Sequence, residues 1–182
     1  LENRLIEELR DMNFLEVSLS INVTAEPDRF GAQGYDSVDF MISMNPGEAP
    51  RPLSSVASGG ELSRIMLAIK CVTGDADGIG TLVFDEIDTG ISGVTSLKTG
   101  EKLHSLSKSH QVICITHQAQ VAAQADTHFM ISKSVQGDRT YTAVTPLDRE
   151  GMIDELARMM GAGDNSSAAR SAAEELKNGA IA

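Results

Sequence analysis

Three short segments of the chain carry residues whose types and spacing suggest ligand chemistry. The first is Ser58-Gly59-Gly60-Glu61, which opens a stretch with helical spacing of apolar residues. Glycines allow a ligand to approach the backbone closely, and the free N–H groups at a helix start favour an anion. A capping box of Ser58 and Glu61 is the structural alternative. The capping box does not explain the two glycines in the first turn, because glycine weakens a helix. Both interpretations therefore stay open on this segment alone.

The second segment is a short strand that ends in two carboxylates. Residues 81–84 form the predicted strand, and Asp85 and Glu86 follow directly. Strand ends are where α/β sheets bind ligands. One carboxylate there can hold Mg²⁺, and its neighbour can orient or deprotonate a water molecule. Two solvated acids at the start of a loop are the alternative, and on this segment alone that alternative is the more frequent case.

The third segment is an apolar strand, residues 112–116, that ends at His117. An imidazole at a strand end can hydrogen-bond to a phosphate or to a carboxylate, although a lone histidine of this kind is more often structural. A hydrolase triad of Ser58, Asp85 and His117 is conceivable. The nucleophile-elbow pattern G-x-S-x-G is absent, however, which argues against that chemistry.

The elements that must position these segments alternate between helices and strands, which predicts an α/β domain. Apolar residues at helical spacing, or bounded by capping and breaking residues, predict helices at 1–12, 61–72, 95–106, 119–125, 152–160 and 166–177. Alternating or continuous apolar residues predict strands at 15–23, 38–44, 81–84, 112–116, 129–135 and 140–147. The first two strands are expected to form an antiparallel pair, and the last two a hairpin that turns at Gly137-Asp138.

Composition narrows the classes of function. The 182 residues suffice for one domain with a core, and no apolar run is long enough to span a membrane. The net charge is −11 and the cations are dispersed, so this chain by itself is a poor candidate for gripping duplex DNA. Cys71 and Cys114 lie in apolar runs, which predicts reduced core thiols in a cytoplasmic protein.

The order of the three segments resembles the parts of the ABC ATPase superfamily. By that resemblance the signature loop is Ser58, Gly59, Gly60 and Glu61, the Walker B aspartate is Asp85, the catalytic glutamate is Glu86, the D-loop residue is Asp88, and the switch histidine is His117. The resemblance implies that ATP and Mg²⁺ are the cofactors, with Asp85 ordering the metal through water. It also implies that Glu86 and His117 are catalytic and that Asp88 couples two ATP sites.

Longer motifs are similar to the RecN family of bacterial DNA-repair proteins, which are SMC-like members of this superfamily. They read V-A-S-G-G-E-L-S-R-I-M-L-A-I-K at 56–70, F-D-E-I-D-T-G-I-S-G at 84–93, Q-V-I-C-I-T-H-Q-A-Q-V-A at 111–122 and E-L-A-R-M-M-G at 155–161. The match is weaker at 94–99, where more polar and basic residues are expected. A role of that segment in supporting the site is therefore in doubt.

The Walker A pattern G-x-x-x-x-G-K-[ST] does not occur in the sequence. The resemblance implies a head built from both ends of a longer chain, with a coiled coil between them. Residues 1–13 are then the end of the coil, and residues 14–182 the C-terminal half of the head, with a mostly parallel sheet, flanking helices and an antiparallel strand pair. The implied partners are the N-terminal half with its P-loop, a second head in an ATP-dependent homodimer, and DNA bound through the full-length protein.

The function implied is ATP hydrolysis at a head–head interface in the repair of DNA double-strand breaks, in the bacterial cytoplasm near the nucleoid. Two alternatives remain at this point. One is a head fragment of another SMC- or ABC-type chromosome-organising ATPase. The other is a non-enzymatic dimerisation module that keeps the fold, although the adjacent Asp85 and Glu86 and the strand-end His117 argue against it.

Overall fold

A computed structural model describes residues 1–28, 30–32, 34–56, 58–74, 76, 78–161 and 166–180. Its elements follow one another in the order α1 (Glu2–Asp11), β1 (Ser18–Ala25), β2 (Asp36–Ser43), β3 (Arg51–Pro52), a 3-10 turn (Leu53–Ser55), α2 (Gly59–Thr73), β4 (Thr81–Phe84), α3 (Gly93–Leu106), β5 (Gln111–Cys114), α4 (Ala119–Ala122), β6 (His128–Gln136), β7 (Arg139–Leu147), α5 (Arg149–Met159) and α6 (Ser167–Gly179). The predicted helices and strands are all present, with shifted ends.

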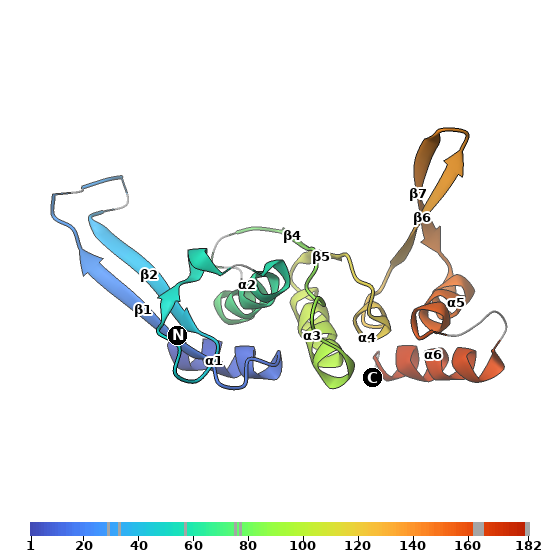
Figure 1. The fold of residues 1–182 in the computed structure, drawn as a ribbon, viewed down its shortest axis with the longest axis horizontal. Coiled ribbons are helices and arrows are strands. Elements are labelled where there is room, and N and C mark those ends of the chain that lie inside the picture. The colour runs from blue at the N-terminus through green and yellow to red at the C-terminus, as the bar shows by residue number, and fades with distance from the viewer. Residues whose placement is uncertain are drawn as a thin grey trace.

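The elements are arranged along one direction rather than around a single centre. Figure 1 shows the helices following one another from α1 to α6, while the hairpins β1–β2 and β6–β7 project at the two ends. One apolar core joins α1, β1, β2, α2, β4 and α3. A second, smaller core joins α4, α5 and α6. Among the described residues, no helix has the length and apolar character needed to cross a membrane.

The expectation of a mostly parallel sheet was wrong for the described strands. They form three small sheets, of which only β4–β5 is parallel; β1–β2–β3 and β6–β7 are antiparallel. The hairpins need only short connections, such as the turn at Gly137 with its positive φ of 61°. The parallel pair needs a crossover, which α3 supplies. The predicted antiparallel pair β1–β2 and the predicted hairpin β6–β7 are confirmed, whereas apolar spacing did not show that the strands divide into three separate sheets.

The parallel pair β4–β5 has one covered face and one open face. Leu82 and Phe84 belong to the first core. On the other face Val83, Ile113 and Ile115 are 64%, 46% and 47% exposed, and Val83 and Ile113 are register partners. Within this chain β5 is therefore covered on one face only. These three residues are called the open sheet face below.

Helix α1 packs onto the body of the molecule. Its apolar stripe is buried in the first core through Leu5 and Leu9. On its polar side, Lys102 of α3 donates to Glu8 at 2.5 Å and to Asp11 at 2.9 Å. Burial disfavours the charge of Lys102, but these hydrogen bonds outweigh it and raise its pKa. The hydrogen bond from Lys102 likewise lowers the pKa of Asp11. The assignment of residues 1–13 to a coiled coil stays a prediction.

We expect Leu9→Ala to destabilise the chain by about 2–5 kcal/mol, because it leaves a cavity in the first core. The matched control is Leu1→Ala, since Leu1 is largely exposed and its loss should change the free energy of unfolding by less than about 0.5 kcal/mol. Urea denaturation followed by circular dichroism measures both. Equal stability of the two variants would contradict the packing of α1 as part of the head.

Candidate functional site

The loop that follows β4, residues 85–91, is held by the first turns of α2 and is called the acidic loop below. Ser63 Oγ donates to the carbonyl of Asp85 at 2.9 Å. One guanidinium nitrogen of Arg64 donates to two carbonyls of the loop, those of Ile87 at 3.1 Å and Thr89 at 2.9 Å. The first two predicted segments therefore form one packed unit within the chain.

The two glycines at the start of α2 are explained by this packing. A Cβ atom on Gly60 would lie 2.9 Å from the carbonyl oxygen of Glu86 and 2.9 Å from Thr89 Cβ. A Cβ on Gly59 would lie 2.9 Å from Glu86 Oε2, which belongs to a flexible side chain. Gly60 is thus required by the backbone of the acidic loop in the same chain. Gly59 is exposed and stays open to an external ligand.

Ser58 occupies the N-cap position of α2, as the capping alternative predicted. Its hydroxyl oxygen accepts a hydrogen bond from Glu61 N at 3.4 Å, and its backbone is extended (φ −92°, ψ 122°). This contact satisfies one of the unpaired N–H groups at the helix start. The remaining N–H groups of the first turn leave the anion-binding interpretation possible, so the two interpretations are compatible in this structure.

Asp85 and Glu86 lie at the end of β4, with both residues exposed. Glu86 has a positive φ of 56°, which a non-glycine residue rarely adopts and which marks a backbone held by its surroundings. The described residues include no group of three potential metal ligands. Mg²⁺ usually takes one or two carboxylates together with phosphates and waters, so Asp85 fits a metal that arrives with a nucleotide.

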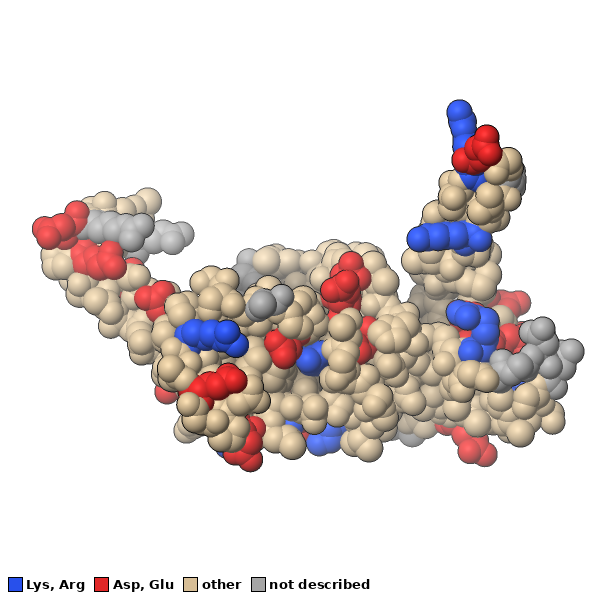
Figure 2. Space-filling model, in the orientation of Figure 1, with Lys and Arg blue, Asp and Glu red and all other residues tan. Residues whose placement is uncertain are grey.

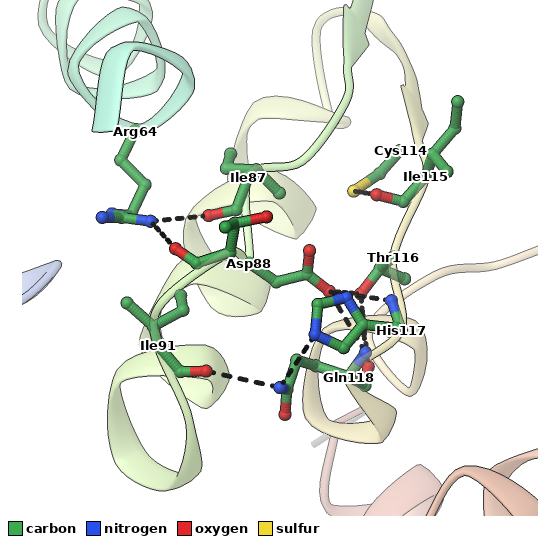
Figure 3. Close-up of polar contacts among 10 residues, drawn as sticks. Arg64, Ile87, Asp88, Ile91, Cys114, Ile115, Thr116, His117 and Gln118 are labelled. Atoms are coloured by element: carbon green, nitrogen blue, oxygen red, sulfur yellow. Dashed lines mark hydrogen bonds and ion pairs between the residues drawn. The ribbon is translucent and has the colours of Figure 1, made fainter. Parts of the chain in front are cut away.

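Asp88 connects the acidic loop to the strand end that carries His117 (Figure 3). Its side chain is 1% exposed. Oδ2 accepts hydrogen bonds from the Thr116 hydroxyl, from His117 N at 2.8 Å and from Gln118 N at 3.1 Å. In this arrangement the Asp88 carboxylate binds donors of its own chain.

The His117 ring is oriented from both of its nitrogens. Nδ1 lies 3.3 Å from Asp88 Oδ2, so a proton on Nδ1 points to the buried carboxylate. Nε2 lies 3.4 Å from Gln118 Nε2, and that amide also donates to the carbonyl of Ile91 at 3.3 Å. Most of the His117 side chain is exposed. The ring can therefore turn its Nε2 edge to a ligand while Asp88 holds the other edge.

Sequence reasoning missed three residues of this site: Arg64, Thr116 and Gln118. Arg64 carries the only signal that a sequence could have given, because a cation next to Ile65 and Leu67 in an apolar helix face needs buried acceptors. The hydrolase triad of Ser58, Asp85 and His117, against which the missing nucleophile elbow already argued, is not what the contacts favour either. Ser58 caps α2, and the carboxylate that His117 meets is Asp88.

The two cysteines are free thiols. Burial raises the pKa of Cys71 to about 11 and that of Cys114 to about 12. Both therefore stay protonated at neutral pH, which makes them poor nucleophiles. Both thiols pack against the first core, in agreement with the prediction of core thiols.

Comparison with known proteins places this site in context. No family model matches the chain. The DNA repair protein RecN of Treponema pallidum is 47% identical over 148 residues, which cover 81% of this chain. RecN of Haemophilus influenzae is 36% identical over 176 residues, or 97% of this chain. The chain is homologous to RecN. It spans only 26% and 32% of the length of these two RecN proteins.

Solved structures agree with the RecN match at the level of the fold. An Smc head domain with a coiled coil and joint, from Pyrococcus yayanosii, has a TM-score of 0.59 at 19% identity and covers 87% of this chain and 29% of that one. An Smc head domain bound to the C-terminal domain of ScpA, from Pyrococcus furiosus, has a TM-score of 0.55 at 20% identity over 86% of this chain and 37% of that one. The RecN homologue thus has the fold of part of an SMC head.

We expect Gly60→Ala to destabilise this RecN homologue by about 1–3 kcal/mol, as overpacking does, although alanine elsewhere in a helix stabilises relative to glycine. The added methyl group would meet the carbonyl of Glu86 and Thr89. Gly80→Ala is the control, because a Cβ there meets nothing within 4 Å. Thermal denaturation of both variants checks the sign. An increase in stability for Gly60→Ala would show that the acidic loop does not pack on α2.

Proposed function

We propose that the chain is the C-terminal half of an SMC-like ATPase head that binds and hydrolyses ATP between two heads in DNA double-strand-break repair. The observation that carries the proposal is the buried carboxylate of Asp88. It draws the strand end with His117 to the strand end with Asp85 and Glu86. Two strand ends that were predicted separately thus offer an exposed acid pair and an exposed imidazole to one ligand.

Each residue has a distinct task in this proposal. A bound Mg²⁺–ATP supplies the γ-phosphoryl group, and phosphoryl transfer needs mainly positioning and charge stabilisation. Asp85 accepts hydrogen bonds from the water shell of the metal. Glu86 orients the attacking water and accepts its proton. His117 would sense the γ-phosphate through the exposed Nε2 edge of its ring, while Asp88 holds the ring at Nδ1. The fixed backbone of the acidic loop keeps these groups in place.

A second part of the same head is the first partner in the proposal. The sequence lacks the Walker A pattern that would cradle the β- and γ-phosphates. The open sheet face is apolar, and a two-stranded parallel sheet with one bare face is marginal by itself. An N-terminal half that adds strands beside β4–β5 and covers Val83, Ile113 and Ile115 would complete both the sheet and the site.

A second head is the other partner. The first turn of α2 presents Ser58 and Gly59 beside the acidic loop, and Gly59 is exposed. We expect these two residues, the backbone N–H of Gly60 and the neighbouring Glu61 to contact the γ-phosphate of the ATP that the second head holds, since the acidic loop fills the space beside the Gly60 Cα. Free N–H groups at a helix start suit that anion. The exposed residues of the acidic loop, which contains Asp88, would then couple the two ATP sites.

DNA binding is assigned to the full-length protein and not to this chain alone. The net charge is −11, and Figure 2 shows no continuous basic surface on the visible face, where several of the lysines and arginines lie along the β6–β7 hairpin and the others are spread out. Clustered cations are what displaces counterions from the phosphates of a duplex. A chromosome-organising SMC-type ATPase remains the second candidate, since Smc heads share the fold. The length of the coiled coil in the complete gene separates the two.

Glu86→Gln keeps the shape of the side chain but removes the proton acceptor. In the complete protein we expect ATP hydrolysis to fall by roughly 100-fold or more, the usual scale for loss of a general base. ATP affinity should survive because Asp85 is intact, so the ATP-bound dimer should accumulate. The control is Glu101→Gln, an exposed glutamate of α3, which should leave turnover unchanged. Wild-type turnover in Glu86→Gln would refute the assignment of the base.

Ser58→Arg separates the signature-loop role from plain capping. If Ser58 faces a second head, the bulky cation should block dimerisation and hydrolysis together while nucleotide binding persists. The control is Ser166→Arg, because Ser166 caps α6 in the same way, accepting from Ala169 N. Loss of a cap alone costs about 1 kcal/mol. Analytical ultracentrifugation and ATP turnover decide; equal behaviour of the two variants would leave Ser58 a cap only.

A further inference from the structure

Arg64 is a buried cation that lies against the first core, next to Phe14. Its residue is 6% exposed, and one guanidinium nitrogen donates to the carbonyls of Ile87 and Thr89. The guanidinium carbon lies 5.3 Å from the centre of the Phe14 ring. Nε forms no hydrogen bond with any described residue. A buried charge with an unsatisfied donor is costly, so the few contacts it does make must hold it in place.

The two carbonyls that Arg64 binds follow Glu86 in the acidic loop and lie on either side of Asp88. Ile87 follows Glu86 directly, and Glu86 has the unusual φ of 56°. Inside the loop, Thr89 N donates to Glu86 O at 3.0 Å and Ile91 N donates to Asp88 O at 3.3 Å. Removing the guanidinium would leave two carbonyls unpaired at the point where the backbone is strained. The direction of the Glu86 side chain therefore depends on Arg64.

Phe14 connects this arginine to the end of α1. Asn13, with a positive φ of 73°, ends the helix, and Phe14 N donates back to Leu9 O at 3.2 Å. The Phe14 ring is buried in the first core. A shift of α1 along its axis would thus change the position of the Phe14 ring relative to the Arg64 guanidinium. The attraction between the guanidinium and the ring face helps to hold the arginine in this position.

We propose that Arg64 is a positioning residue for Glu86, and that Phe14 lets α1 act on it. Movement of α1 relative to α2 changes the support of the Arg64 guanidinium, and the guanidinium sets the geometry of the acidic loop. The catalytic consequence rests on the proposed function. The mechanical link between α1 and the acidic loop does not, because it follows from the contacts of Phe14 and Arg64 alone.

The test uses hydrogen exchange and kinetics of the complete protein, with Arg64→Met, Arg64→Lys and Phe14→Leu. In the nucleotide-free state, the amides of Thr89 and Ile91 should exchange at least about 10-fold faster in Arg64→Met, because the opening of a locally destabilised segment sets exchange. Arg64→Lys should restore part of the protection, since an ammonium can reach one carbonyl. Phe14→Leu keeps the site apolar, removes the ring face and should act in the same direction.

Kinetics give the second readout. A misplaced Glu86 should lower kcat by about 10- to 100-fold in Arg64→Met with the KM for ATP little changed, since small displacements of a positioned group have effects of this size. Arg158→Met is the control, because Arg158 is exposed on α5 and pairs with Glu155. It should leave both the acidic loop and kcat as they are.

The outcomes are distinguishable. Unchanged exchange at Thr89 and Ile91 in Arg64→Met overturns the positioning role, and so does a uniform loss of protection that extends to α5. An effect of Arg64→Met without any effect of Phe14→Leu overturns the link to α1. If the wild-type protein hydrolyses no ATP, the proposed function fails, and the exchange measurements still decide whether Arg64 and Phe14 hold the acidic loop.

Discussion

Contact between the first turns of α2 and the acidic loop supports every other feature of the candidate site. The backbones approach so closely at Gly60 that a side chain there would collide with the carbonyl of Glu86. Ser63 and Arg64, on the following turn, bind carbonyls on both sides of Glu86. Steric exclusion on one side and hydrogen bonds on the other leave the loop few conformations. The left-handed backbone of Glu86 is held within this frame.

Asp88 adds a second constraint, this time electrostatic. A carboxylate that is 1% exposed is tolerated only where donors surround it, and Asp88 Oδ2 meets the Thr116 hydroxyl and the backbone amides of His117 and Gln118. These donors come from the end of β5, whereas Asp88 follows the end of β4. The parallel pairing of the two strands and the buried charge therefore reinforce each other, and the His117 ring takes its orientation from both.

The candidate site is well packed, whereas part of the apolar surface of the molecule is left uncovered. Val83, Ile113 and Ile115 leave apolar area open on β4–β5, and the two cores are connected mainly through α3 and α4. A sheet of two parallel strands ordinarily has both faces covered in α/β proteins. The chain also covers about a quarter to a third of the length of its RecN relatives. Packing and length both agree with a partial head.

Local chemistry in the sequence determined the elements and several of their ends. Apolar spacing predicted the helices and strands, Ser58 predicted the start of α2, and Gly137 predicted the turn between β6 and β7. Each of these signals acts over a few residues, so it survives without knowledge of the fold. The motif order also predicted the RecN relationship.

Tertiary structure alone decided which segments meet. The sequence suggested that Gly60 makes room for a ligand, but the structure fills that room with the acidic loop of the same chain. Asp88, for which the resemblance implied a coupling of two ATP sites, is buried against residues 116–118 of the same chain. The pairing of β4 with β5 and the burial of Arg64 likewise followed from contacts between residues more than 20 positions apart. Such contacts depend on packing in three dimensions, which the spacing of residues along one chain does not encode locally.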